Sequence, residues 1–434
     1  MKLSDYKIIS LAVLGSSLEY FDFTIYALFA HYISLNFFPQ HNTFIALMNT
    51  FAVFAIGYLA RPIGGVLLGH IGDYYGRKHA FTYAILVMAA ATLLIGCLPT
   101  YQSIGIAAPI LLVLLRLLQG LSMGGEVAGA ITFTLEHYEK KRRGLMQSFI
   151  ILGMSLSSAI AGLIGYALIN CLNAQQMLSW GWRIPFVFGF FLGLVGYVMR
   201  KGCAETPAFL DTLKKDDICK VPFFTLTKHY PKQMLIGCCL AVLTSCFASF
   251  LLFSPTYLAM HAEFPANYGF AVSSVGFLTL GLTSVVAGAL SDRLHYKNLF
   301  LISGFLTIVV GYFVFQILLG LPAYTSITMP ILLAAIICLS IAVGLSNGIY
   351  AIAIADQFPT NVRYSGIGFC QNLSMALVGG TAPLIFTGLI HISQSLMAPY
   401  YYLVACAVVV LIAAYFTQKA MERKHDLVPR CNYE

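Results

Sequence analysis

The feature that most constrains the fold of this chain is a series of long apolar runs separated by short polar connectors. A run of about 20 apolar residues can cross the hydrocarbon core of a membrane as a helix. The backbone must satisfy its own hydrogen bonds there, and transmembrane β-strands would instead alternate in segments of about ten residues. Only 10% of the 434 residues are charged, against roughly 25% in an ordinary soluble domain. The sequence therefore predicts an all-α integral membrane protein.

The apolar runs predict twelve membrane spans, several of which are long enough to require tilt or kinks. An even number of spans places both ends of the chain on the same side of the membrane. The predicted spans lie at roughly 8–36, 44–69, 79–98, 104–135, 146–170, 183–200, 233–260, 268–291, 298–320, 328–356, 364–391 and 398–418.

Basic residues are concentrated in the connectors on one side of these spans. With the N-terminus in the cytoplasm, the cytoplasmic segments hold 22 of the 25 Lys and Arg residues, and the outer loops hold only Arg183. The remaining two, Arg61 and Arg116, fall inside spans. Because cytoplasmic connectors carry the positive excess, we expect a multi-pass protein of the inner (cytoplasmic) membrane with both termini cytoplasmic. This topology accounts for the net charge of +8 better than nucleic-acid binding does.

The chain repeats itself at a distance of about half its length. Gly69, Asp73 and Lys78, in the connector after the second span, recur 219 positions later as Gly288, Asp292 and Lys297. A second pair of residues, after the fourth span, recurs after the tenth at an offset of 220: Glu136 and Arg143 correspond to Asp356 and Arg363. We interpret the chain as two copies of one module.

The longest polar connector divides these two copies. The predicted organisation is an N-terminal six-helix half at 1–200, a cytoplasmic linker at 201–232 and a C-terminal six-helix half at 233–434. Two halves repeated in the same direction imply a pseudo-twofold axis along the membrane normal. Such a pair encloses a central cavity that can open to either side in turn.

The chemistry-bearing motifs of enzymes and metalloproteins are missing from the sequence. The eleven cysteines are scattered without a Cys-x-x-Cys pair, which favours small apolar residues in helices over a disulfide framework or a metal site. There is no Gly-x-x-x-x-Gly-Lys-Ser/Thr loop for ATP and no nucleophile–base pair within one span. We therefore predict no cofactor, no metal and no enzymatic activity.

Several motifs carry a family resemblance. The connector Gly69-His-Ile-Gly-Asp73-Tyr-Tyr-Gly76-Arg77-Lys78 resembles the signature between helices two and three of the major facilitator superfamily. Further stretches resemble its metabolite:proton symporters, the group of the proline/betaine transporter and the α-ketoglutarate and shikimate permeases. These stretches are Glu19-Tyr-Phe-Asp22-Phe, Arg61-Pro-Ile-Gly-Gly, Arg116-Leu-Leu-Gln-Gly-Leu-Ser-Met-Gly-Gly-Glu126, Trp180-Gly-Trp-Arg-Ile-Pro-Phe186 and Glu205-Thr-Pro-Ala-Phe. The resemblance covers nearly the whole chain and does not name a solute.

Carboxylates in the first span are the predicted proton carriers. Glu19, Asp22 and Tyr26 are spaced three and four apart, so a helix places them on one face. Desolvation and mutual repulsion prevent two such carboxylates from both staying ionised in a dry setting. Glu126 in the fourth span is a third candidate. The alternative is a set of structural ion pairs with Arg61 or Arg116, while the histidines, the rival carriers, lie in loops or near span ends.

Arg116 is the predicted partner of a substrate carboxylate. It lies near mid-membrane, where a buried charge costs on the order of 3 kcal/mol, and a guanidinium can bind a carboxylate through two parallel hydrogen bonds. An internal bridge to Glu19, Asp22 or Glu126 is the alternative. Arg61 either lines the cavity or extends towards the cytoplasmic surface. The other candidate substrate-binding residues are Tyr26, Gln119, Tyr350 and Asn372.

Aromatic residues and the second half refine the expected solute. Tyr20, Phe21, Phe23 and Tyr26 surround the carboxylates and could hold a quaternary ammonium by cation–π attraction, although packing is the more common role. Spans seven to twelve contain no Lys or Arg, whereas a di- or tricarboxylate needs more than one buried cation. This composition favours a zwitterion.

The repeated connectors are predicted to gate the transporter. The resemblance implies that opposite charges on neighbouring helix ends latch the cytoplasmic side shut, the alternative being a solvated topology signal. The predicted gating residues are Gly69, Asp73, Gly76, Arg77, Lys78, Glu136, Arg143, Asp292, Asp356 and Arg363.

Together these features predict proton-coupled uptake of a small carboxylate-bearing solute, such as the zwitterions proline and betaine. The alternatives are symport of a dicarboxylate or oxo-acid such as α-ketoglutarate, a drug or metabolite efflux antiporter, and a non-transporting membrane receptor or enzyme. The expected partners are the solute, protons and membrane lipid, without nucleic acid, and we expect the monomer to function.

Overall fold

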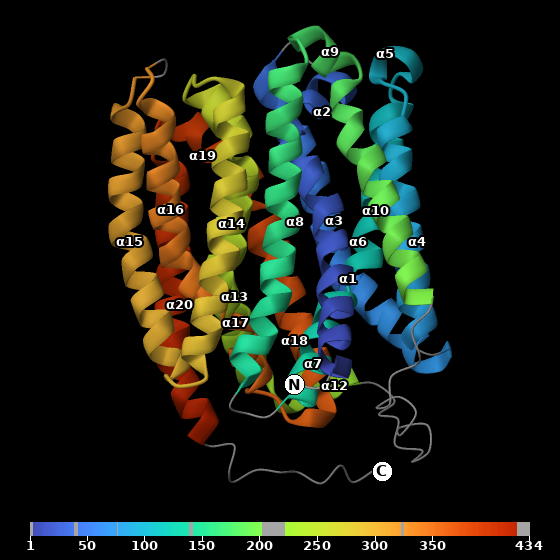
Figure 1. Cartoon of the computed structure of the whole chain (residues 1–434), viewed down its shortest axis with the longest axis vertical. Coiled ribbons are helices and arrows are strands. Elements are labelled where there is room, and N and C mark those ends of the chain that lie inside the picture. The colour runs from blue at the N-terminus through green and yellow to red at the C-terminus, as the bar shows by residue number, and fades with distance from the viewer. Residues whose placement is uncertain are drawn as a thin grey trace.

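The computed structural model describes residues 3–38, 42–75, 77–138, 142–201, 222–322 and 325–422, and these residues form helices without strands. The long helices stand side by side as a bundle (Figure 1). We call the end at which α1 begins and α20 ends the basal end, and the opposite end the distal end.

The first half of the bundle supplies the spans predicted as one to six. Its elements are α1 (Leu3–Leu28), α2 (Ala30–Phe37), α3 (Thr43–Tyr75), α4 (Arg77–Cys97), α5 (Tyr101–Ile104), α6 (Ala107–Met123), α7 (Glu126–His137), α8 (Arg143–Cys171), α9 (Ala174–Ser179), η2 (Gly181–Arg183) and α10 (Ile184–Lys201).

The second half supplies spans seven to twelve. Its elements are α12 (Pro222–His229), α13 (Pro231–Thr256), η3 (Tyr257–His261), α14 (Ala266–Ser291), α15 (Tyr296–Gly320), α16 (Thr328–Asn347), α17 (Tyr350–Ala355), α18 (Thr360–Ser374), η4 (Met375–Gly380), α19 (Ala382–Ser393) and α20 (Ala398–Glu422). The short helix α12 lies within the predicted linker, whose residues 202–221 fall outside the described part of the chain.

The long segments satisfy the requirements of membrane spans. Within the described residues, ten segments are long and apolar enough to cross a membrane, and a shorter apolar helix covers Tyr83–Cys97. The predicted spans four and ten are each divided in two, at Gly124 and Gly125 between α6 and α7 and at Gly348 and Ile349 between α16 and α17. Spans four and ten, which have the same place in the order of the two halves, are therefore both interrupted, as expected from their length.

Small residues join the two halves along α8 and α14, which stand next to each other in the centre of Figure 1. Near the basal end, a Cβ on Gly144 would collide with Ser291 and with the carbonyl of Gly288. Further along the same seam, a Cβ on Gly162 would collide with Ser274. Contact this close requires small side chains, because helix association within lipid depends on packing rather than on exclusion of water.

Within the first half, glycines bring α3 and α6 into backbone contact. A Cβ on Gly120 would collide with the carbonyl oxygen of Gly57, and one on Gly64 with the carbonyl oxygen of Leu121. Gly57 also leaves the space that the side chain of Arg116 occupies, since a Cβ there would lie 3.4 Å from the Nε of Arg116. The two glycine-rich stretches therefore place Arg61 and Arg116 on helices that touch.

Gly120→Ala is expected to destabilise the protein, because the added methyl group meets main chain that has no side-chain freedom to yield. Overpacking of this kind costs about 1–3 kcal/mol. The measurement is thermal unfolding in detergent, where the midpoint should fall by several degrees. Gly320→Ala is the matched control, because a Cβ there meets nothing within 4 Å. An equal effect of the two substitutions would contradict the packing interpretation.

Candidate functional site at the centre of the bundle

Two carboxylates of α1 are buried in the first half. Glu19 and Asp22 are each 3% exposed, and the ring of Tyr26 is fully buried one turn further along the same helix. Asp22 Oδ2 accepts a hydrogen bond of 2.9 Å from the hydroxyl of Thr92 on α4. Its second oxygen, Oδ1, has no hydrogen-bond partner among the described residues and lies against Gly189 of α10. Asp22 is therefore enclosed between α1, α4 and α10.

A chain of hydrogen bonds runs from Asp22 to Arg116. Arg116 Nη1 donates to Gln119 Oε1 over 2.8 Å, within one turn of α6. Gln119 Nε2 in turn donates to Thr92 Oγ1 over 2.8 Å, and Thr92 donates to Asp22. Gln119, predicted to bind substrate, thus uses both ends of its amide to connect these side chains.

Aromatic rings hold both buried arginines. The Cζ atoms of Arg61 and Arg116 lie 4.1 Å and 4.3 Å from the centroid of the same ring, Phe23. Arg61 also lies 3.7 Å from the ring centroid of Tyr58, and Arg116 lies 4.3 Å from that of Tyr26. The protein's own cations thus lie over Phe23 and Tyr26, two of the four rings that the sequence offered as a cage for a quaternary ammonium.

Both guanidinium groups retain unused donors. Arg116 is 0% exposed and Arg61 is 1% exposed, yet the Nε and Nη2 atoms of each have no hydrogen-bond partner among the described residues. A buried donor left without an acceptor costs free energy, more so when it is charged. These four nitrogens belong to two guanidinium groups against the ring of Phe23, and a guanidinium is the kind of donor that pairs with a carboxylate.

The second half approaches this site through η4. The sulfur of Met375 accepts hydrogen bonds from Tyr20 over 3.2 Å and from Arg61 Nη1 over 3.5 Å. Arg61 therefore lines the junction of the two halves and does not extend towards the basal surface. Met375 is a flexible and polarisable neighbour for such a junction.

The remaining predicted substrate residues make contacts of their own. The hydroxyl of Tyr26 donates to the carbonyl of Thr50 over 3.2 Å. Tyr350 is buried and accepts a hydrogen bond of 3.1 Å from Gln371. Asn372 donates to the carbonyl of Gly124 over 2.6 Å and so joins the halves at the helix break. Tyr26 and Asn372 thus have structural partners, whereas Gln371 keeps an oxygen without a hydrogen-bond partner among the described residues.

Part of the predicted gate lies outside the described residues or side chains. The connector between α3, which ends at Tyr75, and α4, which begins at Arg77, includes Gly76, and no side-chain contact is described for its gating residues. The gating residues concerned are Gly69, Asp73, Gly76, Arg77, Lys78 and Glu136, and the side chain of Glu126, a predicted proton carrier, is likewise not described. In the described part of the chain, no group of three or more His, Cys, Asp or Glu could hold a metal ion.

Asp292 makes the clearest basal contact between the halves. Its two oxygens accept backbone hydrogen bonds from Gly144 over 2.8 Å and from Leu145 over 3.2 Å, at the start of α8. Partial burial raises the pKa of Asp292, and these two donors oppose the rise. A carboxylate at the end of α14 thus caps the first turn of a helix in the other half.

The other described gating residues bond within their own half. Tyr296 donates to Asp356 over 3.0 Å, Arg363 Nε donates to the carbonyl of Ala355 over 3.3 Å, and Arg143 Nε donates to the carbonyl of Tyr138 over 3.1 Å. Of the four described gating residues, only Asp292 therefore joins the halves through a hydrogen bond of its side chain that the structure defines.

Asp292→Ala is expected to favour opening at the basal end, because the substitution removes a helix cap worth about 1 kcal/mol. The measurement is the rate at which a maleimide labels Ser148→Cys, on the basal half of α8, in a background without other cysteines. Labelling should accelerate several-fold. Arg363→Ala is the control, because Arg363 donates its described hydrogen bond to the carbonyl of Ala355 within the second half. Equal labelling of both variants would contradict a role for the cross-half cap.

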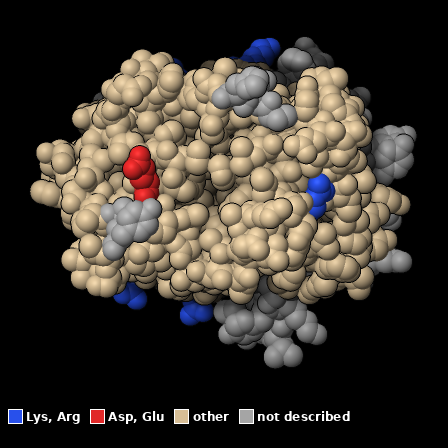
Figure 2. All heavy atoms as spheres, turned by 90° about the horizontal axis from the view of Figure 1, so that it is seen from above, with Lys and Arg blue, Asp and Glu red and all other residues tan. Residues whose placement is uncertain are grey.

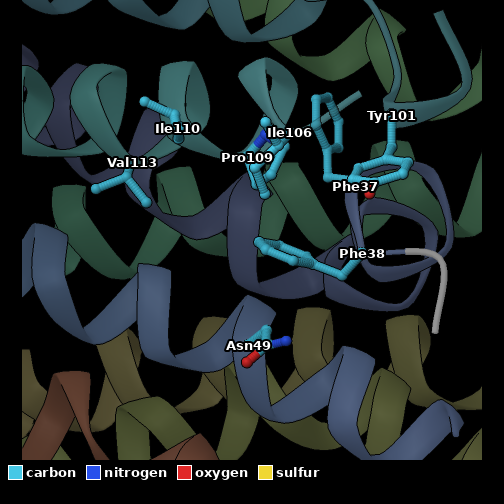
Figure 3. Close-up of a pocket in the computed structure, with 8 residues that line it drawn as sticks. All are labelled: Phe37, Phe38, Asn49, Tyr101, Ile106, Pro109, Ile110 and Val113. Carbon is cyan, nitrogen blue, oxygen red and sulfur yellow. The ribbon is translucent and has the colours of Figure 1, made fainter. Parts of the chain in front are cut away.

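The halves also meet at the distal end, where few charged side chains are in view (Figure 2). Asn267 donates to Asn170 over 3.3 Å, and the rings of Phe44 and His391 stack with centroids 3.9 Å apart. A separate pocket of about 370 Å³ opens at this end of the first half (Figure 3). Its lining is Phe37, Phe38, Asn49, Tyr101, Ile106, Pro109, Ile110 and Val113, and it contains none of the buried charges.

Comparison with known families identifies the family to which this chain belongs. The family model described as Major Facilitator Superfamily matches residues 12–383. The chain belongs to the major facilitator superfamily. The resemblance read from the sequence motifs is confirmed, and so is the superfamily's fold of twelve helices in two six-helix halves.

Two relatives of this chain are named as proline/betaine transporters. A putative proline/betaine transporter of Staphylococcus haemolyticus is 36% identical over 412 residues, covering 91% of this chain and 84% of that protein. The proline/betaine transporter of Escherichia coli is 32% identical over 431 residues, covering 96% of this chain and 84% of that protein. Among solved structures, the xylose transporter XylE from E. coli, in a partially occluded inward-open conformation, aligns with a TM-score of 0.73 at 16% identity, covering 95% of this chain and 97% of XylE.

The structure adds two residues that the sequence did not single out, Thr92 and Met375, and gives a third residue, Phe23, a role beside the arginines. Thr92 joins Asp22 to Gln119, Phe23 lies against both arginines, and Met375 carries the contact to the second half. Thr92 had one available signal, as the single hydroxyl in the apolar stretch from Ala84 to Leu98 of the third span.

Proposed function

We propose that the protein is a secondary transporter that takes up a small carboxylate-bearing zwitterion, such as proline or betaine, together with protons. The observation that carries the proposal is the set of four buried guanidinium nitrogens at Arg61 and Arg116 that have no hydrogen-bond partner among the described residues. A substrate carboxylate would satisfy them through charge-assisted hydrogen bonds. The names of the relatives support the same class of solute.

Proton coupling is assigned to Asp22 and Glu19. Both carboxylates are buried in the half that holds the arginines, and Asp22 reaches Arg116 through two intervening side chains. A proton on Asp22 removes a negative charge near Arg116 and so strengthens its attraction for the substrate anion. By linkage, the bound anion strengthens proton binding by the same factor.

The proposal also covers the membrane location, orientation and partners of the protein. It places the basal end in the cytoplasm of a cell whose inner membrane holds the chain, because the basic residues cluster in the basal connectors. In this proposal the monomer is sufficient for transport, lipid surrounds it, nucleic acid is not a partner and the protein catalyses no chemical reaction.

A dicarboxylate or oxo-acid is the second candidate for the solute. Two guanidinium groups against one ring supply the two buried cations that such a solute needs. The second half contributes no charged side chain to the described buried set, so both anionic groups would have to bind within the first half. A zwitterion requires only one anionic contact and is the better match.

The test is uptake into proteoliposomes under an imposed inward proton gradient. Labelled proline, betaine and α-ketoglutarate are compared, and accumulation of proline or betaine that a protonophore abolishes is the expected result. Accumulation of α-ketoglutarate alone would favour the second candidate. An efflux antiporter would not accumulate solute under this gradient, and a receptor or enzyme would show no solute flux.

A further inference from the structure

We propose that Thr92 is a positioning residue for proton coupling, because its hydroxyl keeps Asp22 and Gln119 hydrogen-bonded in both protonation states of Asp22. The inference rests on the proposed function, in which Asp22 carries a proton and Arg116 binds the substrate anion. It concerns how the two sites remain connected while the proton arrives and leaves.

The geometry supplies two positions for a single hydrogen atom. Thr92 Oγ1 lies 2.9 Å from Asp22 Oδ2 and 3.0 Å from the backbone carbonyl of Met88, and either oxygen can accept its hydrogen. The same Oγ1 accepts a hydrogen bond of 2.8 Å from Gln119 Nε2. A hydroxyl has one hydrogen to donate and two lone pairs to accept, so these three contacts fit its full capacity.

The hydroxyl of Thr92 then has a complete set of hydrogen bonds in each protonation state of Asp22. With Asp22 ionised, Thr92 donates to the carboxylate and accepts from Gln119. With a proton on Asp22 Oδ2, the carboxylic acid donates to Thr92, which rotates its own hydrogen to the carbonyl of Met88. The only covalent change is the bond between the incoming proton and Oδ2, while Gln119 donates to Thr92 in both states.

The consequence for Arg116 is a fixed position beside a variable charge. Gln119 Oε1 accepts from Arg116 Nη1 in both states, so the guanidinium does not need to be repositioned when Asp22 changes charge. What changes at Arg116 is the electrostatic attraction of Asp22. A fixed geometry with a switchable charge is a direct way to make anion affinity depend on protonation.

The other charged groups near Asp22 are few. Glu19 is on the same helix, one turn away, and Arg116 comes from α6. The elements packed closest contribute uncharged groups, Thr92 from α4 and Gly189 from α10, while α8 contacts α1 through Ser158, which hydrogen-bonds to Thr24.

The test measures the protonation of Asp22 directly. Infrared difference spectra of the detergent-solubilised full chain, recorded across a pH titration, contain the stretch of a protonated carboxyl group, and the band that Asp22→Asn removes belongs to Asp22. In Thr92→Val the ionised form of Asp22 loses a donor, so the midpoint of this band should rise by about one to two pH units. Thr92→Ser keeps the hydroxyl, and its midpoint should match the parent.

Transport provides the second readout. In Thr92→Val, pH-gradient-driven accumulation should fall about tenfold more than solute exchange at equal pH, while Thr92→Ser retains both. Thr307→Val is the matched control, because its buried hydroxyl donates only to the carbonyl of Ser303 on its own helix. Loss of a folded peak in size-exclusion chromatography would identify a misfolded variant, and Thr92→Ala then takes the place of Thr92→Val with the same expectations.

Two outcomes would overturn the inference. One is a titration midpoint in Thr92→Val that coincides with the parent, and the other is a shift of the same size in Thr92→Ser. The infrared measurement does not depend on transport, so it tests Thr92 even if the parent protein accumulates none of the solutes. That last result would instead count against the proposed function.

Discussion

Replacing Arg116 with alanine is expected to weaken solute binding about 100-fold, equivalent to about 2.7 kcal/mol. Removing one member of a buried, hydrogen-bonded charge pair costs 2–5 kcal/mol, because the other charge loses its partner. Arg116 is fully buried and has two nitrogens available to an anion. Binding is measured by isothermal calorimetry or by the thermal shift that each solute induces in detergent.

Arg116→Lys should recover only part of this loss. An ammonium keeps the charge, but it does not present the planar fork that binds a carboxylate through two hydrogen bonds. The matched control is Arg183→Gln, since Arg183 donates to the carbonyls of Gly96 and Leu98 at the distal end of the first half. Arg183→Gln should lower thermal stability and leave affinity unchanged. Unchanged affinity in Arg116→Ala would refute the anion site.

Asp22→Asn is expected to abolish uphill accumulation while solute exchange continues. Asparagine is close in shape, and its amide oxygen can accept the hydrogen bond from Thr92, but it does not carry a proton in the pH range of transport. Internal and external solute concentrations should therefore become equal despite an imposed proton gradient. The measurement compares gradient-driven uptake with exchange in the same proteoliposomes.

Glu19→Gln tests the second carboxylate in the same assay. Because Asp22 is the carboxylate in contact with the hydrogen-bonded chain to Arg116, we expect a smaller loss of accumulation in Glu19→Gln than in Asp22→Asn. Full gradient-driven uptake by both variants would refute the assignment of proton coupling. The opposite order of effects would transfer the main role to Glu19.

The fold and the buried charges could be predicted from the sequence because both follow from the free energy of placing individual residues in a membrane. A span is visible as a run of apolar residues, and a charged residue within it is conspicuous because burial is expensive. Glu19, Asp22, Arg61 and Arg116 were identified in this way, and the structure places all four in the interior of the first half.

The connections between these charges could not be predicted, since they depend on how separate helices pack. Burying a threonine hydroxyl within a span costs little free energy, so its presence there does not indicate a function. In the structure, however, Thr92 hydrogen-bonds to both α1 and α6. The position of Arg61 was undecided from its sequence neighbours, and its contact with Met375, 314 residues away, settles it. Asn372 is polar and mid-span like a substrate ligand, but its amide donates to the carbonyl exposed at the helix break of Gly124.

The described buried charges all belong to the first half, and the hydrogen bond of Arg61 to the second half goes to the uncharged side chain of Met375. In the proposed mechanism the proton and the solute carboxylate therefore bind in the same half, and the second half contributes uncharged groups beside Arg61. Substitutions in η4 and α18 can reshape the space beside Arg61 without altering the groups that carry the proton. The range of solutes could therefore be changed by substitutions in the second half. The groups that couple transport to the proton gradient would be retained in the first half.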